Sequence, residues 1–462
     1  MREYSAFFFF FFRLKWICKI KYPCVILLWR WIKMKKKYII FSLVTLVLLV
    51  ALITSFNYFK TTNTYIDDSV NNQTKITKGI SMNLEQTAGA GDYKTVTRSS
   101  WPTEGYKFNT ELSRCENGGE INWDDINKKV IVTGNVSDKC YVYFDIWIPS
   151  IAAYCTSGTD LATCVKNFGD QGPSVSNIYI HNSALTNGAG DNSYRYAGAN
   201  PNNFICFGSD ATTCPTDNLY RIIGVIDGKV KLIKYDYMTT IELGTDGDYS
   251  KTYKEYQTMY GTYKGTYGDG AKIGVYYWNN ATQKNTWSES NLNKTNLNRN
   301  FINYLGSTWA NKIATTTWKV GGNTNANIVS QIPSVAYTNE ITNPVTTNTT
   351  DNATTYSAKI GLMYVSDYGF AASPNAWTLT IGSYNNTIAT SSNWMYMGLF
   401  EWTISRMSVF YSTAFYVYYS GYVYNINGEV NGSKAVRASF NLESSVKYVS
   451  GTGSMSDPIR IN

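Results

Sequence analysis

The feature that most constrains this chain is an uncharged apolar run near its N-terminus, from Tyr38 to Phe56. The run contains no Pro or Gly, and it has about the 20 residues that a helix needs to cross a bilayer. Three lysines, Lys35 to Lys37, stand directly before it. Because basic residues stay on the cytoplasmic side of a membrane helix, the pattern predicts a single-pass transmembrane helix. The N-terminus would lie inside the cell and the bulk of the chain outside it.

Two questions about this region stay open at the level of sequence. The stretch that starts at Met34, MKKKYIIFSLV, forms a complete basic n-region and apolar h-region. We therefore predict that residues 1–33 are upstream sequence translated in error, and that residues 34–58 form the anchor or signal. The residues from Ile53 to Phe56 make a poor cleavage site, so a retained anchor is favoured over a chain secreted after cleavage.

The positive charge of the chain is concentrated in the same region. The formal net charge is +8 at pH 7, and residues 1–37 hold ten Lys or Arg against one acidic residue. The rest of the chain is close to neutral. This distribution indicates membrane topology rather than a basic surface for phosphates, so we predict no nucleic-acid partner.

Cysteine usage agrees with export. An even number of cysteines beyond the apolar run suggests disulfides, and closing short loops costs the least entropy. The predicted pairs are Cys115 with Cys140, Cys155 with Cys164, and Cys206 with Cys214. No pair has C-x-x-C spacing and the chain has a single histidine, so we predict no metal ligands.

Composition divides the remaining chain into four parts. Residues 59–100 are polar with small residues between, which is typical of a stalk or linker. Short strand patterns over 101–145 predict a small all-β module closed by the first disulfide. Residues 146–216 are turn-rich and read as a connector with two local disulfides. Residues 217–462 carry the longer strand and helix patterns and are predicted to form an α+β domain.

Two patterns define this last domain. Asp227-Gly228 stands between two β-branched runs, which predicts a hairpin. Lys229 and Lys231 alternate with apolar residues, which predicts that one face of the second strand is exposed to solvent. The stretch from Trp287 to Ile313 predicts the main helix, broken near Gly306. Its apolar row comprises Leu297, Phe301, Leu305, Trp309 and Ile313.

Several segments over residues 190–462 together resemble a family of uncharacterised exported proteins of low-GC Gram-positive bacteria. The corresponding stretches are Trp287 to Leu292 followed by Leu297-Asn298, then Glu401-Trp402, and Val436 to Phe440. Ala438 stands where that family usually has Pro. Because the family has no assigned activity, this resemblance implies an exported protein but no function.

The stretch from Gly398 to Thr403 is also similar to the G-N-V-W-E-W-T motif of C-type-lectin-like domains, including those of the formylglycine-generating enzyme type. Arg437 matches an arginine of a late strand in these domains. The resemblance implies a C-type-lectin-like α+β fold with antiparallel hairpins and one main helix. Leu399 replaces an Asn that can ligate calcium, so we predict no cofactor, calcium being the one that the resemblance leaves open. The catalytic cysteines of that enzyme are absent, so oxidase activity is not implied.

These observations favour a membrane-anchored, surface-displayed binding or adhesion protein, with a glycan or a protein surface as ligand. A structural envelope or pilin-like component is the first alternative. An extracellular glycosidase-like hydrolase that uses Asp367 and Glu401 is the second, although we predict no enzyme and no catalytic residue. Pairing of Glu401 with Arg406 or Arg437 would instead make that carboxylate structural. The candidate ligand-binding residues are Tyr364, Asp367, Trp394, Glu401, Trp402, Tyr416, Tyr418 and Arg437.

Overall fold

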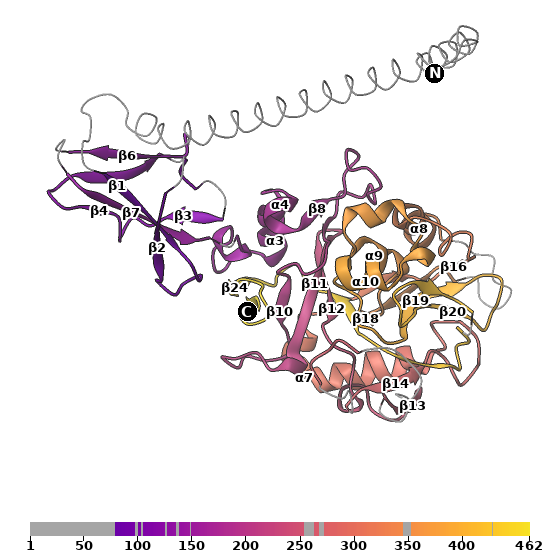
Figure 1. The fold of residues 1–462 in the computed structure, drawn as a ribbon. Coiled ribbons are helices and arrows are strands. Elements are labelled where there is room, and N and C mark those ends of the chain that lie inside the picture. The colour runs from indigo at the N-terminus through magenta and orange to yellow at the C-terminus, as the bar shows by residue number, and fades with distance from the viewer. Residues whose placement is uncertain are drawn as a thin grey trace, which may run out of the picture. The chain divides into compact units, whose positions relative to one another are not determined.

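The computed structural model describes residues 79–462 except 98–99, 103–104, 125–126, 135–137, 148, 254–262, 268–271, 345–352 and 427. The chain divides into two compact units, Met1–Ile148 and Pro149–Asn462 (Figure 1). The predicted transmembrane segment at 38–56 and the predicted extension at 1–33 lie outside the described residues. Among the residues that are described, no helix has the length and apolar character needed to cross a bilayer.

The first unit is built from short strands. Their bounds are β1 (Ile80–Glu85), β2 (Tyr93–Val96), β3 (Tyr106–Phe108), β4 (Arg114–Cys115), β5 (Glu120–Asp124), β6 (Lys129–Thr133) and β7 (Cys140–Ile146). Within the described residues, five of them form a sheet of order β2-β1-β7-β3 with β4 also paired to β7, and β5 and β6 form a separate hairpin. Strand β1 runs parallel to β7. The predicted linker over 59–100 therefore overlaps residues that form β1 and β2.

A small aromatic core holds this unit together. Val142 and Phe144 alternate with partly buried positions on β7 and are fully buried. The ring of Trp123 meets Phe144 edge-on with 5.6 Å between centroids. Cys115 and Cys140 face each other in the β4–β7 ladder and are disulfide-bonded, as predicted.

The second unit contains two large sheets, each of seven strands within the described residues. The first has the order β18-β23-β12-β11-β9-β8, with β10 paired to β11. Its strands are β8 (Ile178–Ile180), β9 (Tyr194–Tyr196), β10 (Phe204–Cys206), β11 (Leu219–Ile226), β12 (Lys229–Lys234), β18 (Ile360–Gly361) and β23 (Ser439–Asn441). Strands β8 to β10 come from the predicted connector at 146–216, so this segment is part of the sheet rather than a loop between domains.

The second sheet has the order β13-β14-β22-β19-β20-β21, with β16 paired to β19. Its strands are β13 (Tyr249–Thr252), β14 (Gly274–Tyr277), β16 (Gly322–Asn323), β19 (Glu401–Met407), β20 (Ala414–Val417), β21 (Val423–Tyr424) and β22 (Ser433–Ala435). Two further pairs join β15 (Thr316–Lys319) to β17 (Thr355–Ala358), and β24 (Tyr448–Ser450) to β25 (Arg460–Ile461).

The helices of the second unit are short, and α8, α9 and α10 lie close together in Figure 1. The α-helices are α3 (Leu161–Gly169), α4 (Pro173–Ser176), α5 (Thr240–Leu243), α7 (Ile302–Ala310), α8 (Pro333–Tyr337), α9 (Val365–Phe370) and α10 (Asn386–Ser392). Within the described residues, two π-helical segments are η3 (Leu292–Phe301) and η4 (Thr338–Thr342), and four 3-10 turns are η1 (Ile151–Ala153), η2 (Thr216–Asn218), η5 (Pro374–Thr378) and η6 (Ile381–Ser383).

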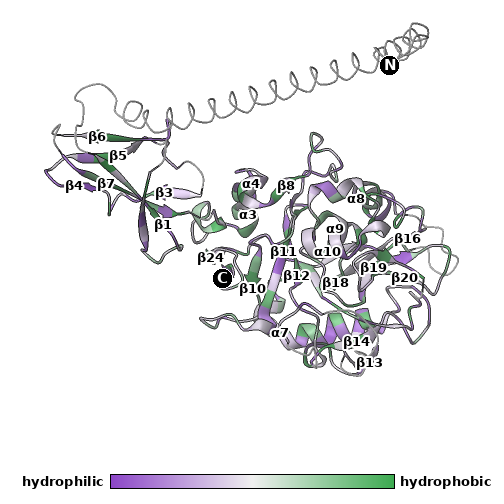
Figure 2. Cartoon of the chain, in the orientation of Figure 1, coloured by the Kyte–Doolittle hydropathy of each residue, from purple (hydrophilic) through white to green (hydrophobic). Residues whose placement is uncertain are grey.

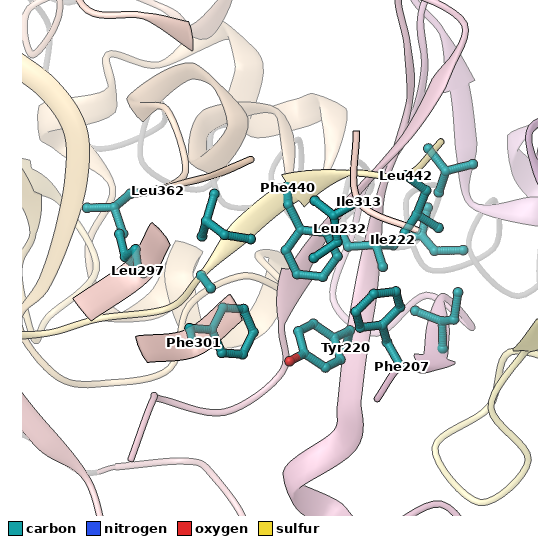
Figure 3. Packing of buried hydrophobic residues seen from close by; sticks show 14 of the residues in the cluster. Phe207, Tyr220, Ile222, Leu232, Leu297, Phe301, Ile313, Leu362, Phe440 and Leu442 are labelled. Carbon is teal, nitrogen blue, oxygen red and sulfur yellow. The ribbon is translucent and has the colours of Figure 1, made fainter. Parts of the chain in front are cut away.

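The predicted apolar row of the helical stretch is buried, as expected from its spacing. Figure 2 shows hydrophobic and hydrophilic residues mixed along this segment, so one side of it can face the core while the other meets water. Leu297 and Phe301 are fully buried. Leu297 lies beside Leu362 (Figure 3), and the ring centroid of Phe301 is 6.4 Å from that of Phe440 of β23. The rings of Phe207, Tyr220 and Phe440 complete this contact, with 5.0 Å between the centroids of Phe207 and Phe440.

The fold class predicted from the sequence is wrong. The described residues are mainly β-sheet with short helices, where we predicted a C-type-lectin-like α+β domain with one main helix. The helical stretch is divided between η3 and α7, and Gly306 leaves helical geometry at a φ of 70°. Strand β19 pairs in parallel with β16 and β22, which antiparallel hairpins alone do not provide. The predicted transmembrane helix likewise finds no support among the described residues.

Local predictions in the second unit are confirmed. Asp227 and Gly228 join β11 to β12 with positive φ angles of 49° and 75°, which is the backbone that a tight hairpin turn requires. The pairs Cys155–Cys164 and Cys206–Cys214 are disulfide-bonded. Short-range turn and disulfide chemistry was therefore readable from sequence, whereas sheet order was not.

Candidate functional site

A pocket of about 330 Å³ opens on the first sheet of the second unit. Its walls come from β9 and the β11–β12 hairpin, from β15, from the end of α8 and from the start of α9. The side chains that define its chemistry are Arg195, Lys231, Trp318, Tyr337, Tyr364 and Asp367. These residues are far apart in sequence, so the sheet topology brings them together.

Strand register places the two buried cations of the pocket, Arg195 and Lys231. Arg195 lies opposite Gly224 in the β9–β11 ladder, and Lys231 of β12 lies opposite Gly224 from the other side. Cβ on Gly224 would come within 2.1 Å of the backbone oxygen of Tyr194, so only glycine fits between these strands. Lys231 was predicted to lie on a solvent-exposed face of its strand. Only 4% of Lys231 is exposed, because the pocket walls cover this residue.

The carboxylate of Asp367 joins these cations in one buried network. Lys231 Nζ lies 2.5 Å from Asp367 Oδ2, and Arg195 Nη1 lies 3.3 Å from Asp367 Oδ1. Arg195 also donates from Nη2 to Asp191 Oδ2 at 2.9 Å. Two cations therefore face two carboxylates, and the network is balanced in charge.

This network shifts the pKa values of Lys231 and Asp191. Burial lowers the pKa of Lys231, and the carboxylate of Asp367 opposes that shift. For Asp191, burial acts against the charged form, but Arg195 and the hydroxyl of Ser193 outweigh it and lower the pKa. The hydroxyl of Tyr337 donates to Asp191 Oδ2 at 2.7 Å and holds that carboxylate in place.

Aromatic rings cover the same cations. Lys231 Nζ lies 4.5 Å from the ring centroid of Tyr364 and 5.6 Å from that of Trp318. The guanidinium of Arg195 lies 5.2 Å from the ring of Tyr337. The Tyr364 hydroxyl accepts a hydrogen bond from the backbone of Lys319 at 2.7 Å, which joins β15 to the start of α9. The pocket is therefore held in shape before any ligand arrives.

The geometry favours binding over acid–base catalysis at Asp367. Oδ1 of this carboxylate faces Arg195, while Oδ2 accepts from Lys231 and from the backbone N–H of Tyr364 at 3.0 Å. Both oxygens of this carboxylate are therefore already engaged by protein donors. Glu401, the partner proposed for a hydrolase, does not line this pocket.

Glu401 instead forms a structural ion pair. Arg437 donates to it from Nε at 2.7 Å and from Nη2 at 2.9 Å, and both side chains are almost fully buried. Arg406, the other predicted partner, donates from Nε to the carbonyl of Val320 at 2.7 Å. Of the alternatives left open by the sequence, pairing with Arg437 is the one observed.

The remaining predicted ligand-binding residues also lie outside the pocket. Trp394 is buried, and the guanidinium carbon of Arg221 lies 4.7 Å from the centroid of its indole ring. Trp402 and Tyr416 are buried in the second sheet, and Lys434 Nζ lies 4.0 Å and 4.2 Å from their rings. Tyr418 is half-buried and stacks on Tyr422 at 4.7 Å. Only Tyr364 and Asp367 of the predicted set line the pocket.

Sequence reasoning missed Arg195, Lys231, Trp318 and Tyr337 as site residues. The alternation around Lys231 was visible, but it indicated solvent rather than a pocket. Trp318 and Tyr337 carry no motif and reach the site only through the pairing of β15 with β17 and the packing of α8 on α9. No local sequence signal marked them.

One cluster in the first unit has the composition of a metal site. Ligand atoms of Cys115, Asp138 and Cys140 lie within 4.8 Å of one another. The two sulfurs are joined to each other, so they are not thiolates. Asp138 accepts backbone hydrogen bonds from Asn117 at 2.8 Å and Gly119 at 2.9 Å. This cluster is therefore a braced turn rather than a metal centre.

No protein-family model, no curated protein and no solved structure matches this chain. Relatives therefore supply no activity, ligand or partner. A functional proposal has to rest on the chemistry of the pocket.

Proposed function

We propose that the second unit is a saccharide-binding module of an exported protein. The observation that carries this proposal is the pocket in which Trp318, Tyr337 and Tyr364 lie beside fixed charged groups. Sugar rings present apolar C–H faces and polar hydroxyl edges, so their pockets combine aromatic surfaces with a few well-placed donors and acceptors. Three disulfides within the described residues support folding in an oxidising compartment.

The polar rim of the pocket suits hydroxyl recognition. Thr315, Thr316 and Thr317 follow one another along the rim, and Asn441 of β23 adds an amide. Hydroxyl and amide groups can each donate and accept, which matches the mixed demands of a polyol. Asp367 and Lys231 lie deeper and would fix the orientation of the ligand.

Blocking the pocket is expected to weaken saccharide binding at least about tenfold, a loss of about 1.4 kcal/mol. Thr317→Trp adds bulk at an exposed position of β15 that lines the pocket, so the fold should tolerate it. Thr387→Trp, at an exposed position of α10 outside the pocket lining, is the matched control. The oxidised full chain would be screened on a glycan array, and hits would be measured by calorimetry.

The expected pattern is saturable binding that Thr317→Trp removes and Thr387→Trp preserves. Absence of binding across neutral and acidic saccharides would overturn the proposal. Binding that survives Thr317→Trp would place the saccharide site elsewhere and would also overturn it. Release of reducing ends during the assay would show turnover and revive the hydrolase alternative.

A further inference from the structure

The rim of the pocket carries positive charge that its interior does not. Lys229 of β12 and Lys319 of β15 both line the pocket and are partly exposed. Among the described residues, neither lysine has a carboxylate within ion-pair distance. Asp227 is the acidic residue of the rim. Two lysines therefore stand against one carboxylate at the entrance.

The two interior cations, Arg195 and Lys231, are not available to bind the anionic group of a ligand. Arg195 and Lys231 are already paired with Asp191 and Asp367 at 2.5–3.3 Å. A ligand anion that displaced Asp367 from them would leave that carboxylate buried without either of its cations, which is costly. An incoming anion is therefore favoured at the rim, where the lysine ammonium groups remain hydrated and adjustable.

Both rim lysines line the same pocket, one from β12 and the other from β15. Lys229 and Lys231 are two residues apart on β12, so their side chains leave the same face of the sheet. Lys319 follows Trp318 on β15, and its backbone N–H is fixed by the Tyr364 hydroxyl. The rim lysines thus border the aromatic walls that would hold a sugar ring.

From this arrangement we infer that the saccharide is anionic, with a carboxylate or phosphate group held by Lys229 and Lys319. This inference rests on the proposed function, because it specifies the ligand class of the same pocket. The sugar ring occupies the cavity beside the accessible edges of Tyr337 and Tyr364, its hydroxyls meet Thr315 to Thr317, and its acidic group stays at the rim. A neutral saccharide would use the walls and hydroxyls but leave both lysines without a partner.

Two matched ligand pairs test this inference on the full chain. The first is a uronic-acid oligosaccharide and the same compound after reduction of its carboxylates to alcohols. The second is a polyol phosphate oligomer and its dephosphorylated form. At low ionic strength each anionic form that enters the pocket is expected to bind about tenfold more tightly than its neutral partner, and added salt should shrink this advantage. The larger ratio identifies the anion as carboxylate or phosphate.

The double variant Lys229→Gln/Lys319→Gln is expected to remove the advantage while retaining affinity for the neutral form. Lys272→Gln/Lys294→Gln, an equal charge change at exposed lysines outside the pocket, should leave it intact. Equal binding of both members of both pairs by the wild type would overturn the inference but leave the saccharide site standing. An advantage unaffected by the rim variant would also overturn it. Absence of binding to all four compounds would instead remove the proposed function itself.

Discussion

Replacing Glu401 with glutamine is expected to lower the free energy of unfolding of the second unit by about 3–5 kcal/mol. The partner, Arg437, is 1% exposed and holds the carboxylate through two hydrogen bonds of 2.7 Å and 2.9 Å. Burial acts against the charge of Arg437, but the Glu401 carboxylate outweighs it and raises the pKa. The guanidinium cannot lose its proton, so removal of the carboxylate leaves a buried charge uncompensated.

Urea unfolding followed by tryptophan fluorescence measures this effect. The double variant Glu401→Gln/Arg437→Met removes the stranded charge, so it is expected to be more stable than Glu401→Gln alone. A loss below about 1 kcal/mol for Glu401→Gln would show that water or another carboxylate reaches Arg437, and the buried-pair interpretation would fail.

The contrast between this pair and the pocket explains what sequence reasoning could reach. Glu401 and Arg437 drew notice because each sits in a recognisable local pattern, and the sequence left their pairing as one of two alternatives. Their joint burial in the core was not deducible, because it depends on β19 pairing in parallel with β22 at Ala435. Long-range register of this kind has no local signal.

The disulfides and the β11–β12 hairpin were predictable because they depend on residues that are close together in the sequence. Each depends on a short loop whose closure is decided by residues near one another, such as Asp227 and Gly228. The pocket combines β9, β12, β15 and α9, whose residues span positions 194 to 370. Tyr364 and Asp367 were among the predicted ligand-binding residues, while Arg195 and Trp318 join them only through tertiary packing.

The same distinction bears on function. Of the eight residues predicted to bind ligand, the six outside the pocket are aromatic or charged groups used in packing, such as Trp394 against Arg221. Large aromatic side chains bury extensive apolar area, so an aromatic-rich chain places most of them in its core. Function is better sought where such rings line a cavity beside fixed charges, as Trp318 and Tyr364 do.

Acidification is expected to destabilise the second unit through His181, the single histidine of the chain. This imidazole is fully buried, with Phe370 and Trp377 at 4.7 Å and 5.2 Å, and its Nδ1 accepts the backbone N–H of Ala189 at 3.0 Å. Burial, aided by the nearby charge of Arg195, lowers its pKa from 6.5 to about 3. Between these values the unfolded chain binds a proton that the folded chain does not. The stabilising contribution is therefore complete above the unfolded pKa and is lost as pH falls toward about 3.

The expected loss is about 2 kcal/mol between about pH 7 and about pH 5, because each pH unit below the unfolded pKa contributes up to about 1.4 kcal/mol. Urea unfolding at several pH values would measure it. His181→Asn keeps an acceptor for Ala189 and removes the titrating group, so its stability should vary much less over this interval, although its aromatic contacts are lost. The comparison uses the pH dependence and not the absolute stability, since the variant starts from a weaker core. If the free energy of unfolding changed equally with pH in both proteins, other groups would cause the acid sensitivity. His181 would then be protonated in the folded chain as readily as in the unfolded chain.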